Sequence, residues 1–461
     1  MDYKDIVIKK ERSLKEAMNI LDNTRKGIVI VVDENEGFLG VITSGDIRTA
    51  IINGINPDSS VEKMMNKDPF YVEENNENEI LKNIEIIKKF PEGGIIKIPV
   101  LNKDKKVVEI TSLIINIDKK IKKGLEEEKS VKKVLIVGGA GYLGSVLSRK
   151  LINLGYKVRV LDNLTYSDLS IKDLYNNKNF EFLNRDIRNI KDVVESIIGV
   201  DAVIHLASIV GDPAGSINPQ KTLESNYFAT KILAEICKYN QINRFIFASS
   251  CSVYGATEKE ELIDENSKLT PLSLYAETKI KSEEALLNMA DSNFAPTILR
   301  MATLYGYSPR MRFDLVINLL TAKAVYEKEI TIFGGEQWRP FLHVEDAAEA
   351  YIKCLEAPIN KIKSMIFNIG GNKNNYKLLE IGEKIKKVIP DADLKINKQL
   401  QDNRNYKVSF DKAEDILKFK PIKEVEEGIK EILEIIKKEE IINYKDKIYS
   451  NYEFLNNINI D

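Results

Sequence analysis

Long apolar runs, paired cysteines and an excess of one charge are all missing from this 461-residue chain. No apolar stretch approaches the roughly 18 residues of a membrane-spanning helix, and we expect neither such a span nor a secretory signal. Three scattered cysteines argue against a disulfide framework or a zinc site, so we expect no metal and a reducing, cytoplasmic compartment. With 68 basic and 70 acidic residues, the chain offers no electrostatic reason to bind nucleic acid. Its length predicts several folded units.

The most informative motif is a glycine-rich turn that follows the apolar run 134–137. Its glycines are spaced three apart, and an amphipathic segment continues beyond them. Glycine lets the backbone turn sharply and approach a pyrophosphate, while a helix N-terminus adds free N–H groups and the positive end of its dipole. The pattern predicts a phosphate-binding junction between a strand and a helix. The residues expected to contact the cofactor there are Gly138, Gly141, Tyr142, Leu143 and Gly144.

A second apolar run, 157–161, ends at Asp162. This acidic residue lies about 20 residues past the glycines, as a dinucleotide-binding unit requires. Its carboxylate would accept hydrogen bonds from the adenosine ribose hydroxyls and would repel a 2′-phosphate, so the motif predicts NAD rather than NADP. The alternative is that Asp162 only starts a turn with Asn163.

A helix, strand, turn and strand occur twice within the first 115 residues. The first copy has predicted strands at 28–32 and 40–43, and the second has them at 95–98 and 107–111. The helix of the second copy is expected around residues 81–87. On this spacing position 28 corresponds to 95, and position 43 to 111. A unit that cannot close its own core, present twice, predicts a pseudo-symmetric pair.

On these features residues 1–115 resemble a pair of CBS domains, a regulatory module that commonly binds adenine nucleotides. The resemblance is carried by the segment Gly40-Val-Ile-Thr43-Ser-Gly-Asp46, and it implies that Thr43 and Asp46 contact a ribose. In the second copy Ile114 stands where the corresponding aspartate is expected, so at most one nucleotide site is implied. The alternative is that Thr43 and Asp46 only cap the next helix and that the pair serves dimerisation.

From residue 132 onwards apolar runs alternate with helical stretches, which predicts βαβ units around a parallel sheet. Predicted strands at 180–183 and 202–205 end in polar or small residues, and doubly wound sheets bind ligands at this carboxyl edge. Asp186 would accept from the adenine amino group, whereas His205 is expected to pack rather than act as a base. Further cofactor contacts are expected from Asn163, Ile187, Leu206, Ala207 and Ser208.

The strand 244–248 runs into a serine-rich end that contains Ser250. Tyr275 follows in the next predicted helix, and Lys279 stands four residues beyond it on the same helix face. A phenol with a pKa of about 10 is a poor base at neutral pH, but a neighbouring ammonium and a positive nicotinamide ring would favour the phenolate. Tyr275 would then exchange a proton with a sugar hydroxyl while Lys279 holds the nicotinamide ribose and Ser250 the reacting oxygen.

Together these motifs resemble the extended short-chain dehydrogenase/reductase family, and within it the NAD-dependent nucleotide-sugar epimerases and dehydratases. The resemblance covers residues 132–455. It implies that three residues form the catalytic trio, namely Ser250, Tyr275 and Lys279. It also implies that Asn226 lies near the cofactor and that the protein is a homodimer.

Loops late in the chain match the substrate-binding segments of the same family. The implied substrate-binding residues, besides Ser250, are Thr303, Arg339 and Arg404. Arginine in such a loop can grip a nucleotide diphosphate through two hydrogen bonds. For Arg310 and Arg312, surface ion pairs are the alternative.

Comparison with the motifs of this family reduces the number of reactions that the chain is expected to catalyse. Cys251 and Ser252 stand where a 4,6-dehydratase carries an Asp-Glu pair, so dehydration is not expected. Three reactions remain: 4-epimerisation through a transient 4-keto intermediate, 2-epimerisation, and NAD(P)-dependent reduction of a 4-keto nucleotide sugar. Asp162 favours tightly held NAD and therefore epimerisation over reduction, and we expect 4-epimerisation. Thr303 and Pro340 depart from the common 4-epimerase pattern and leave the identity of the sugar open. A non-catalytic NAD-binding sensor is the alternative from another functional class.

The expected fold class is α/β. We predict a Rossmann-type doubly wound parallel sheet with a smaller C-terminal substrate domain in residues 132–461. An α+β CBS pair in residues 1–118 precedes it. Residues 119–131, rich in Lys and Glu, are expected to form the linker.

Overall fold

The computed structural model describes residues 3–24, 26–52, 55–69, 71–74, 94–115, 131–256, 262–291, 294–398, 404–438 and 441–457. The chain divides into two compact units, Met1–Ser130 and Val131–Asp461. The helix predicted around residues 81–87 and positions 119–130 of the predicted linker lie outside the described residues. Within the described ranges, no helix is long and apolar enough to cross a membrane.

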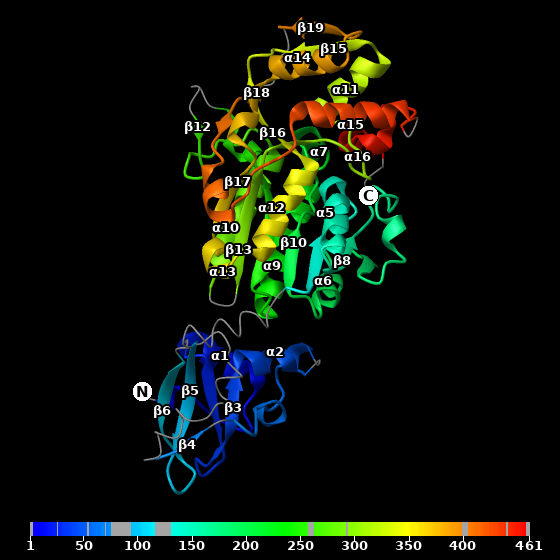
Figure 1. Ribbon diagram of the computed structural model, residues 1–461. Coiled ribbons are helices and arrows are strands. Elements are labelled where there is room, and N and C mark those ends of the chain that lie inside the picture. Colours follow the sequence, from blue (N-terminus) through cyan, green and yellow to red (C-terminus); the bar gives the residue numbers. More distant parts are fainter. Residues whose placement is uncertain are drawn as a thin grey trace. The chain divides into compact units, whose positions relative to one another are not determined.

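The first unit contains two small three-stranded sheets, with the orders β1-β2-β3 and β4-β5-β6. Figure 1 labels β3, β4, β5 and β6 of these sheets. Its elements are η1 (Lys4–Ile6), β1 (Val7–Lys9), α1 (Leu14–Thr24), β2 (Ile28–Val32), β3 (Phe38–Thr43), α2 (Ser44–Ile52), η2 (Val61–Lys63), β4 (Val72–Glu73), β5 (Gly94–Leu101) and β6 (Val107–Ile115). In each sheet the first strand lies parallel to the second, and the second lies antiparallel to the third. The predicted repeat is therefore present in the backbone.

The strand registers show how the two copies correspond. Each sheet has one register shift, between Val31 and Val32 in the first copy and between Val100 and Leu101 in the second. Aligning these two shifts makes position 28 correspond to 97, and position 43 to 112. The predicted correspondence of 28 with 95 and of 43 with 111 is therefore wrong. Because β5 begins further from its turn than β2 does, the first apolar residues of the two strands are not equivalent.

The corrected register changes the residue that corresponds to Asp46. Continued along the chain, it gives Ile115 rather than Ile114. The strand β6 runs through Ile115, whereas β3 ends at Thr43 and α2 begins at the next residue. The second copy thus differs from the first in both residue type and backbone at this position, and the conclusion of at most one implied site is unchanged.

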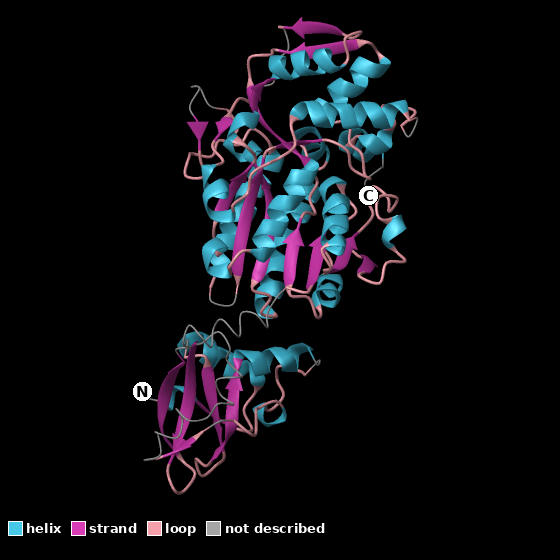
Figure 2. Ribbon diagram, viewed as in Figure 1, coloured by secondary structure: helices cyan, strands magenta, loops and turns pink. Residues whose placement is uncertain are grey.

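The second unit is built on a seven-stranded parallel sheet with the order β17-β13-β11-β10-β7-β8-β9. The strands are β7 (Lys133–Val137), β8 (Lys157–Asp162), β9 (Phe180–Asn184), β10 (Ala202–His205), β11 (Arg244–Ser250), β13 (Ala295–Met301) and β17 (Ile366–Ile369). The chain order reverses between β7 and β10, which is the switch point where doubly wound sheets bind ligands. The predicted doubly wound fold is confirmed (Figure 2).

Helices cover both faces of this sheet because successive strand side chains point to opposite sides. Val134 and Ile136 pack in the cluster that contains α5 and α12 residues, whereas Leu135 and Val137 pack with α6, α9 and α10. The helical elements are η4 (Lys172–Leu174), α5 (Tyr142–Asn153), α6 (Ile190–Ile197), α7 (Asp212–Ile217), α8 (Pro219–Leu223), the π-helix η5 (Glu224–Phe228), α9 (Ala229–Tyr239), η6 (Cys251–Tyr254), α10 (Leu274–Met289), α12 (Val344–Glu356) and α13 (Ile359–Ile362).

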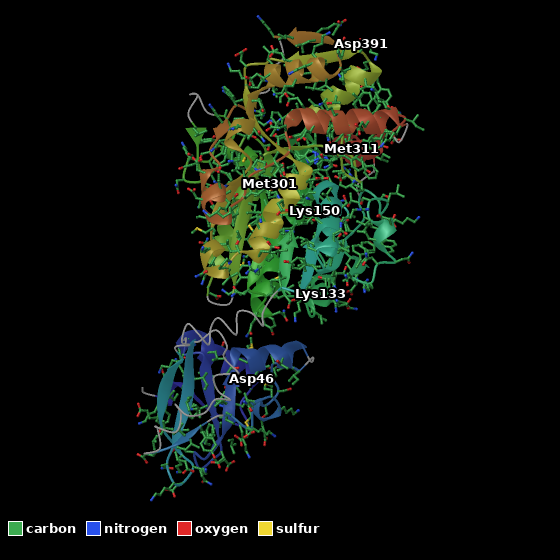
Figure 3. The ribbon with its side chains drawn as sticks, viewed as in Figure 1. Asp46, Lys133, Lys150, Met301, Met311 and Asp391 are labelled. Atoms are coloured by element: carbon green, nitrogen blue, oxygen red, sulfur yellow. The ribbon has the colours of Figure 1, made fainter. Side chains whose placement is uncertain are left out.

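A smaller part of the second unit lies beyond the carboxyl edge of the sheet (Figure 1). Figure 3 labels Lys133, where β7 begins, and Met301, where β13 ends at that edge. The elements are β12 (Leu262–Ile263), β14 (Thr303–Tyr305), α11 (Val316–Tyr326), β15 (Glu329–Phe333), β16 (Trp338–His343), η7 (Asn372–Asn374), β18 (Asn375–Lys377), α14 (Leu378–Val388), β19 (Asp393–Asn397), β20 (Lys407–Val408), η8 (Ala413–Leu417), α15 (Val425–Lys437), η9 (Lys447–Tyr449) and α16 (Asn451–Asn457). It has its own apolar cluster, which includes Ile317, Ile381 and Ile429.

Candidate active site

The glycine turn follows β7 and leads directly into α5. Gly138 has a φ of +85°, and a Cβ atom there would lie 2.6 Å from the backbone nitrogen of Ala207. A Cβ on Gly139 would meet Val160, and one on Gly144 would lie 2.5 Å from the carbonyl oxygen of Gly138. These three glycine positions therefore have no room for a side chain, and α5 begins at Tyr142, within the motif. This backbone can approach a pyrophosphate closely, as the motif predicts.

Asp162 ends β8 beside this turn. Its Oδ2 accepts the Ala140 N–H at 3.0 Å, and its Oδ1 accepts the Leu164 N–H at 2.9 Å. Burial raises the pKa of Asp162, and the two backbone hydrogen bonds oppose that rise. A carboxylate has about four acceptor positions, so it can also accept from ribose hydroxyls. The glycine cradle and this carboxylate together fit a dinucleotide.

Asp186 lies just past β9 and is already paired. Arg188 donates to its two carboxylate oxygens at 3.0 and 2.8 Å, and Asn163 donates to Oδ2 at 3.2 Å. Burial raises the pKa of Asp186, but these hydrogen bonds outweigh burial and lower it to about 2. An adenine amino group would therefore share this carboxylate with Arg188. Ile187 is buried in the core beside it.

The loop after β10 carries Leu206, Ala207 and Ser208. The backbone N–H groups of Leu206 and Ala207 both donate to the carbonyl of Val137 at 2.8 Å, which draws the loop against the glycine turn. Ser208 donates to the carbonyl of Ile209. This region of the loop therefore lies at the switch point, where cofactor contacts are expected.

Asn226 holds the same loop from the other side. Its Oδ1 accepts the Ile209 N–H at 2.7 Å, and its Nδ2 donates to the Ile209 carbonyl at 3.1 Å. The residue is buried within the π-helix η5, an irregularity that is frequent at functional sites. Its side chain thus fixes the loop rather than pointing freely into the site.

His205 is fully buried at the end of β10, as expected for a packing role. Its Nε2 bonds the Thr230 hydroxyl at 2.8 Å, and that hydroxyl donates to the Asn226 carbonyl. The Thr230 hydroxyl proton is engaged with the backbone carbonyl of Asn226, so His205 Nε2 carries a proton and donates it to the Thr230 oxygen. Burial lowers the pKa of His205 to about 3, so the ring is neutral.

The structure brings Ser250, Tyr275 and Lys279 together at the carboxyl edge. Ser250 ends β11, and its side chain hydrogen-bonds that of Tyr275. Lys279 lies one turn after Tyr275 on α10, with its Nζ 5.7 Å from the centre of the tyrosine ring. That Nζ donates to the carbonyl of Ala248 at 2.8 Å. The trio implied by the family resemblance is therefore a spatial cluster.

Burial dominates the electrostatics of the trio. Burial raises the pKa of Tyr275, Asp212 adds to the rise, and Ser250 and Arg312 oppose it. Burial also lowers the pKa of Lys279 to about 7. Without the cofactor, burial therefore dominates the pKa of Tyr275, because both side chains lose hydration in the same buried region. The expected lowering of that pKa by Lys279 and a bound nicotinamide ring stays a prediction.

A buried ion pair that was not expected supports this cluster. Arg300 Nη2 lies 2.6 Å from Glu283 Oε2, and each side chain is 3% exposed. Ser249 also donates to Glu283, and Arg300 donates to the Tyr254 hydroxyl at 2.9 Å. These contacts join β11 and β13 to α10 directly behind the trio. The only sequence signal is that Glu283 follows Lys279 by four residues.

The substrate-side residues come from the smaller part of the unit. Thr303 begins β14, and Arg339 lies in β16 with its guanidinium 5.1 Å from the centre of the Tyr406 ring. Arg404 forms an ion pair with Asp212 at 3.1 Å. Burial raises the pKa of Tyr406 to about 12, and Arg339 and Arg404 both oppose that rise. The two arginines therefore lie on either side of Tyr406, near Tyr275. The sequence analysis did not identify Asp212, the partner of Arg404.

The surface ion pairs considered for Arg310 and Arg312 are wrong, because both residues are only 8% exposed. Arg312 donates to the two oxygens of Asp314 at 2.9 and 3.0 Å. Arg310 lies 4.3 Å from the centre of the Tyr166 ring, and burial lowers its pKa to about 10. Its Nε and Nη2 have no hydrogen-bond partner among the described residues. A buried guanidinium with unpaired donors is suited to an anionic ligand.

Tyr142 connects the glycine turn to the smaller part of the unit. Its hydroxyl donates to the Gly306 carbonyl at 2.6 Å and accepts from Asn318 at 3.2 Å. Ser308 donates to the Tyr142 carbonyl at 2.6 Å. The phenol of Tyr142 is thus engaged with the substrate-side loops. Leu143, next to it, is partly buried against the core.

In the first unit, Thr43 and Asp46 contact each other at the start of α2. The Thr43 N–H and hydroxyl both donate to Asp46 Oδ2 at 2.7 Å, and Thr43 Oγ1 accepts the Asp46 N–H at 3.4 Å. This is the capping arrangement considered as the alternative. Figure 3 labels Asp46 at this helix start. A ribose contact by either residue stays a prediction.

Comparison with known proteins gives matches to both units. Residues 134–370 match the model of the NAD dependent epimerase/dehydratase family, and residues 1–53 match that of the CBS domain. UDP-glucose 4-epimerase of Bacillus subtilis is 28% identical over 55% of this chain and 81% of its own length. UDP-glucuronic acid decarboxylase 1 of Xenopus tropicalis is also 28% identical, over 68% of this chain and 74% of its own.

Solved structures resemble the second unit over nearly their full length. UDP-glucuronic acid 4-epimerase from Bacillus cereus, in complex with UDP-glucuronic acid and NAD, has a TM-score of 0.58 and 30% identity. The match covers 66% of this chain and 99% of that one. The UDP-Glc/GlcNAc 4-epimerase from Campylobacter jejuni has a TM-score of 0.59 and 27% identity, over 67% of this chain and 99% of its own.

Proposed function

Since this chain belongs to the NAD dependent epimerase/dehydratase family, we propose that it is a nucleotide-sugar 4-epimerase. The observation that carries the proposal is the cluster of Ser250, Tyr275 and Lys279 at the switch point of the sheet, beside the glycine turn. Relatives named as 4-epimerases of UDP-sugars support the choice of reaction.

NAD is the cofactor of this family. The residues that would hold its pyrophosphate and adenosine ribose are the turn from Gly138 to Gly144 and the carboxylate of Asp162. When bound, NAD would supply the redox chemistry, since its nicotinamide ring can take a hydride from the sugar and give it back. No room exists at Gly138, Gly139 or Gly144 for a side chain that would block this approach.

Tyr275 is the group that moves the proton. Its phenolate takes the proton of the sugar 4-hydroxyl as the 4-keto intermediate forms, and the phenol that results returns this proton when the alcohol is restored. Ser250, which hydrogen-bonds Tyr275, orients the same oxygen. Lys279 is held by the Ala248 carbonyl one helical turn away, where its charged form favours the phenolate.

Among the described residues that directly follow Ser250, none supports dehydration. The residues after Ser250 are Cys251 and Ser252, which the structure buries in η6. Neither carries a carboxylate that could remove water from the sugar. The neighbouring acid Asp212 is bound by Arg404 and by Ser273. Epimerisation needs the proton transfer that Tyr275 performs and a hydride transfer to and from NAD, but no carboxylic acid that removes water.

A panel of UDP-, GDP-, CDP- and dTDP-sugars, incubated with purified protein, tests the proposal. We expect one sugar to be converted to its 4-epimer without net consumption of cofactor. Release of carbon dioxide from UDP-glucuronic acid would assign a decarboxylase instead, and consumption of NADPH with a 4-keto sugar would assign a reductase. No conversion of any substrate, with NAD bound, would leave the non-catalytic sensor.

We also propose that an adenine nucleotide binds the first unit through Thr43 and Asp46 and tunes the activity. The CBS match over residues 1–53 and the paired sheets support this regulatory role. Calorimetry of the full chain with AMP, ADP and ATP tests it, with the Thr43→Ala/Asp46→Ala variant as control. Absence of binding, or equal binding by the variant, would remove the proposal.

The homodimer and the cytoplasmic location stay predictions. Sedimentation of the full chain measures the first. We expect the mass of two copies of the 52.4 kDa chain.

A further inference from the structure

We propose that Asn451, in the C-terminal segment 443–457, is a positioning residue for Tyr275. Asn451 joins two loops that lie on different sides of the catalytic tyrosine. The inference rests on the proposed function, because it concerns the proton transfer that Tyr275 performs.

The segment is tied to the site by a series of specific contacts. The Phe313 N–H donates to the Tyr449 carbonyl at 2.8 Å, and the backbone N–H of Asn451 donates to Asp314 Oδ2 at 3.0 Å. On its other side, Asn451 Nδ2 donates to the carbonyl of Val210 at 3.4 Å. Asn451 is 4% exposed, so these contacts are shielded from water. One residue therefore connects the loop after β14 with the loop after β10.

The packing of α16 extends the same connection. Phe454 lies against Tyr166, with ring centres 5.3 Å apart, and Tyr166 in turn stacks on Arg310. Leu455 is buried in the same helix, and α16 contacts α7. The C-terminal helix thus closes over the loops that follow β8, β10 and β14.

The first loop that Asn451 contacts, after β14, carries the positively charged Arg312 near Tyr275. Asp314, the acceptor of the Asn451 N–H, binds Arg312 through both carboxylate oxygens. Arg312 acts against the rise in the Tyr275 pKa. The position of the C-terminal segment therefore bears on the position of this guanidinium through Asp314.

The second loop that Asn451 contacts, after β10, leads to the negatively charged Asp212 near Tyr275. Val210 is followed by Gly211, which has a φ of +103°, and by Asp212, which begins α7. Ser273, two residues before Tyr275, donates to Asp212 at 2.5 Å and caps α10. A Cβ on Gly215 would lie 3.4 Å from that of Tyr275, so α7 packs directly on the tyrosine.

Tyr275 therefore lies among charged and titratable groups from every side. These groups are Asp212 of α7, Arg312 of the loop after β14, Tyr406 of the segment before β20, Tyr351 of α12, and Lys279 of its own helix. Asp212 and Arg312 have opposite effects on the proton affinity of the phenol, and the effect of Asp212 is the larger. Asn451 contacts both loops. Loss of its hydrogen bonds would therefore change the positions of Asp212 and Arg312, and with them the proton affinity of the Tyr275 phenol.

The test replaces Asn451 with alanine and compares kcat, KM and the pH profile with those of the wild type. A misplacement of about 1 Å at a reacting group costs up to about 100-fold, so we expect Asn451→Ala to lower kcat by about 10- to 100-fold. We expect KM to change less. Asp212, on the loop that loses its contact with Asn451, raises the pKa of Tyr275 more than Arg312 lowers it. If Asp212 moves away, the Tyr275 pKa falls, so the acidic limb of the pH profile should move to lower pH.

Tyr452→Ala is the matched control, since Tyr452 lies on the same helix and is 40% exposed. We expect its kinetics to equal those of the wild type. Thermal unfolding and NAD binding of each variant separate positioning from loss of the fold. A variant Asn451→Ala with wild-type kcat and pH profile, or with only a lower Tm, would overturn the inference. A wild type that converts no sugar would instead overturn the proposed function, and this inference with it.

Discussion

Replacing Glu283 with glutamine removes the negative partner of Arg300 while keeping the side-chain size. Both side chains are 3% exposed, and Arg300 donates to the Glu283 oxygens at distances of 2.6 to 3.2 Å. The variant leaves a guanidinium buried without a countercharge. Breaking a buried pair in this way costs about 3–5 kcal/mol. We expect the free energy of unfolding of the second unit to fall by that amount.

The fluorescence of Trp338 measures this change in the second unit alone, because Trp338 is the single tryptophan of the chain and lies in β16. For a unit of this size, 1 kcal/mol shifts Tm by about 2 °C, so the expected loss is about 6–10 °C. Urea denaturation with the same probe should show a matching fall in the midpoint.

Glu329→Gln is the control, since its partner Lys395 is 61% exposed and such a surface pair contributes only about 0–1 kcal/mol. A second control, Glu283→Gln combined with Arg300→Met, removes the buried charge and should recover part of the stability. If Glu283→Gln lowers Tm no more than Glu329→Gln does, the buried pair does not stabilise the site and the reasoning is refuted.

Further changes test the site itself. Tyr275→Phe should lower kcat at least about 100-fold with NAD still bound, because it removes the proton-transfer hydroxyl; near-normal turnover would contradict its role. Gly144→Ala should abolish NAD binding in equilibrium titrations, since its Cβ would lie 2.5 Å from the Gly138 carbonyl oxygen. Asp162→Asn should reduce the preference for NAD over NADP by about tenfold or more, measured by titration with both cofactors. Lys279 has a pKa near 7, below its usual value, so the folded state binds fewer protons than the unfolded state between about pH 7 and 10.5. Stability should therefore rise with pH across that window, and Lys279→Met should lose this dependence in denaturation measured at pH 7 and 9.5.

Features that depend on a few neighbouring residues were open to prediction. The spacing of Gly138, Gly141 and Gly144 and the position of Asp162 follow from the backbone of one βαβ unit. Tyr275 and Lys279 share a helix face because they are four residues apart. Alternating apolar runs likewise predicted the strands and the doubly wound sheet. In the first unit the same reasoning found the repeat, but it missed the register of the second copy, because β5 is longer than β2.

Burial and contacts between distant residues came only from the tertiary structure. Asp212 meets Arg404 from the smaller part of the unit, and Asn451 near the end of the chain reaches Val210. Arg312 is buried rather than on the surface, and burial, not Lys279, dominates the pKa of Tyr275. The sequence pattern of a segment predicts its helices, strands and turns, because local backbone conformation depends mainly on neighbouring residues. The environment of each charge depends on which distant segments pack around it, and only the folded chain decides that.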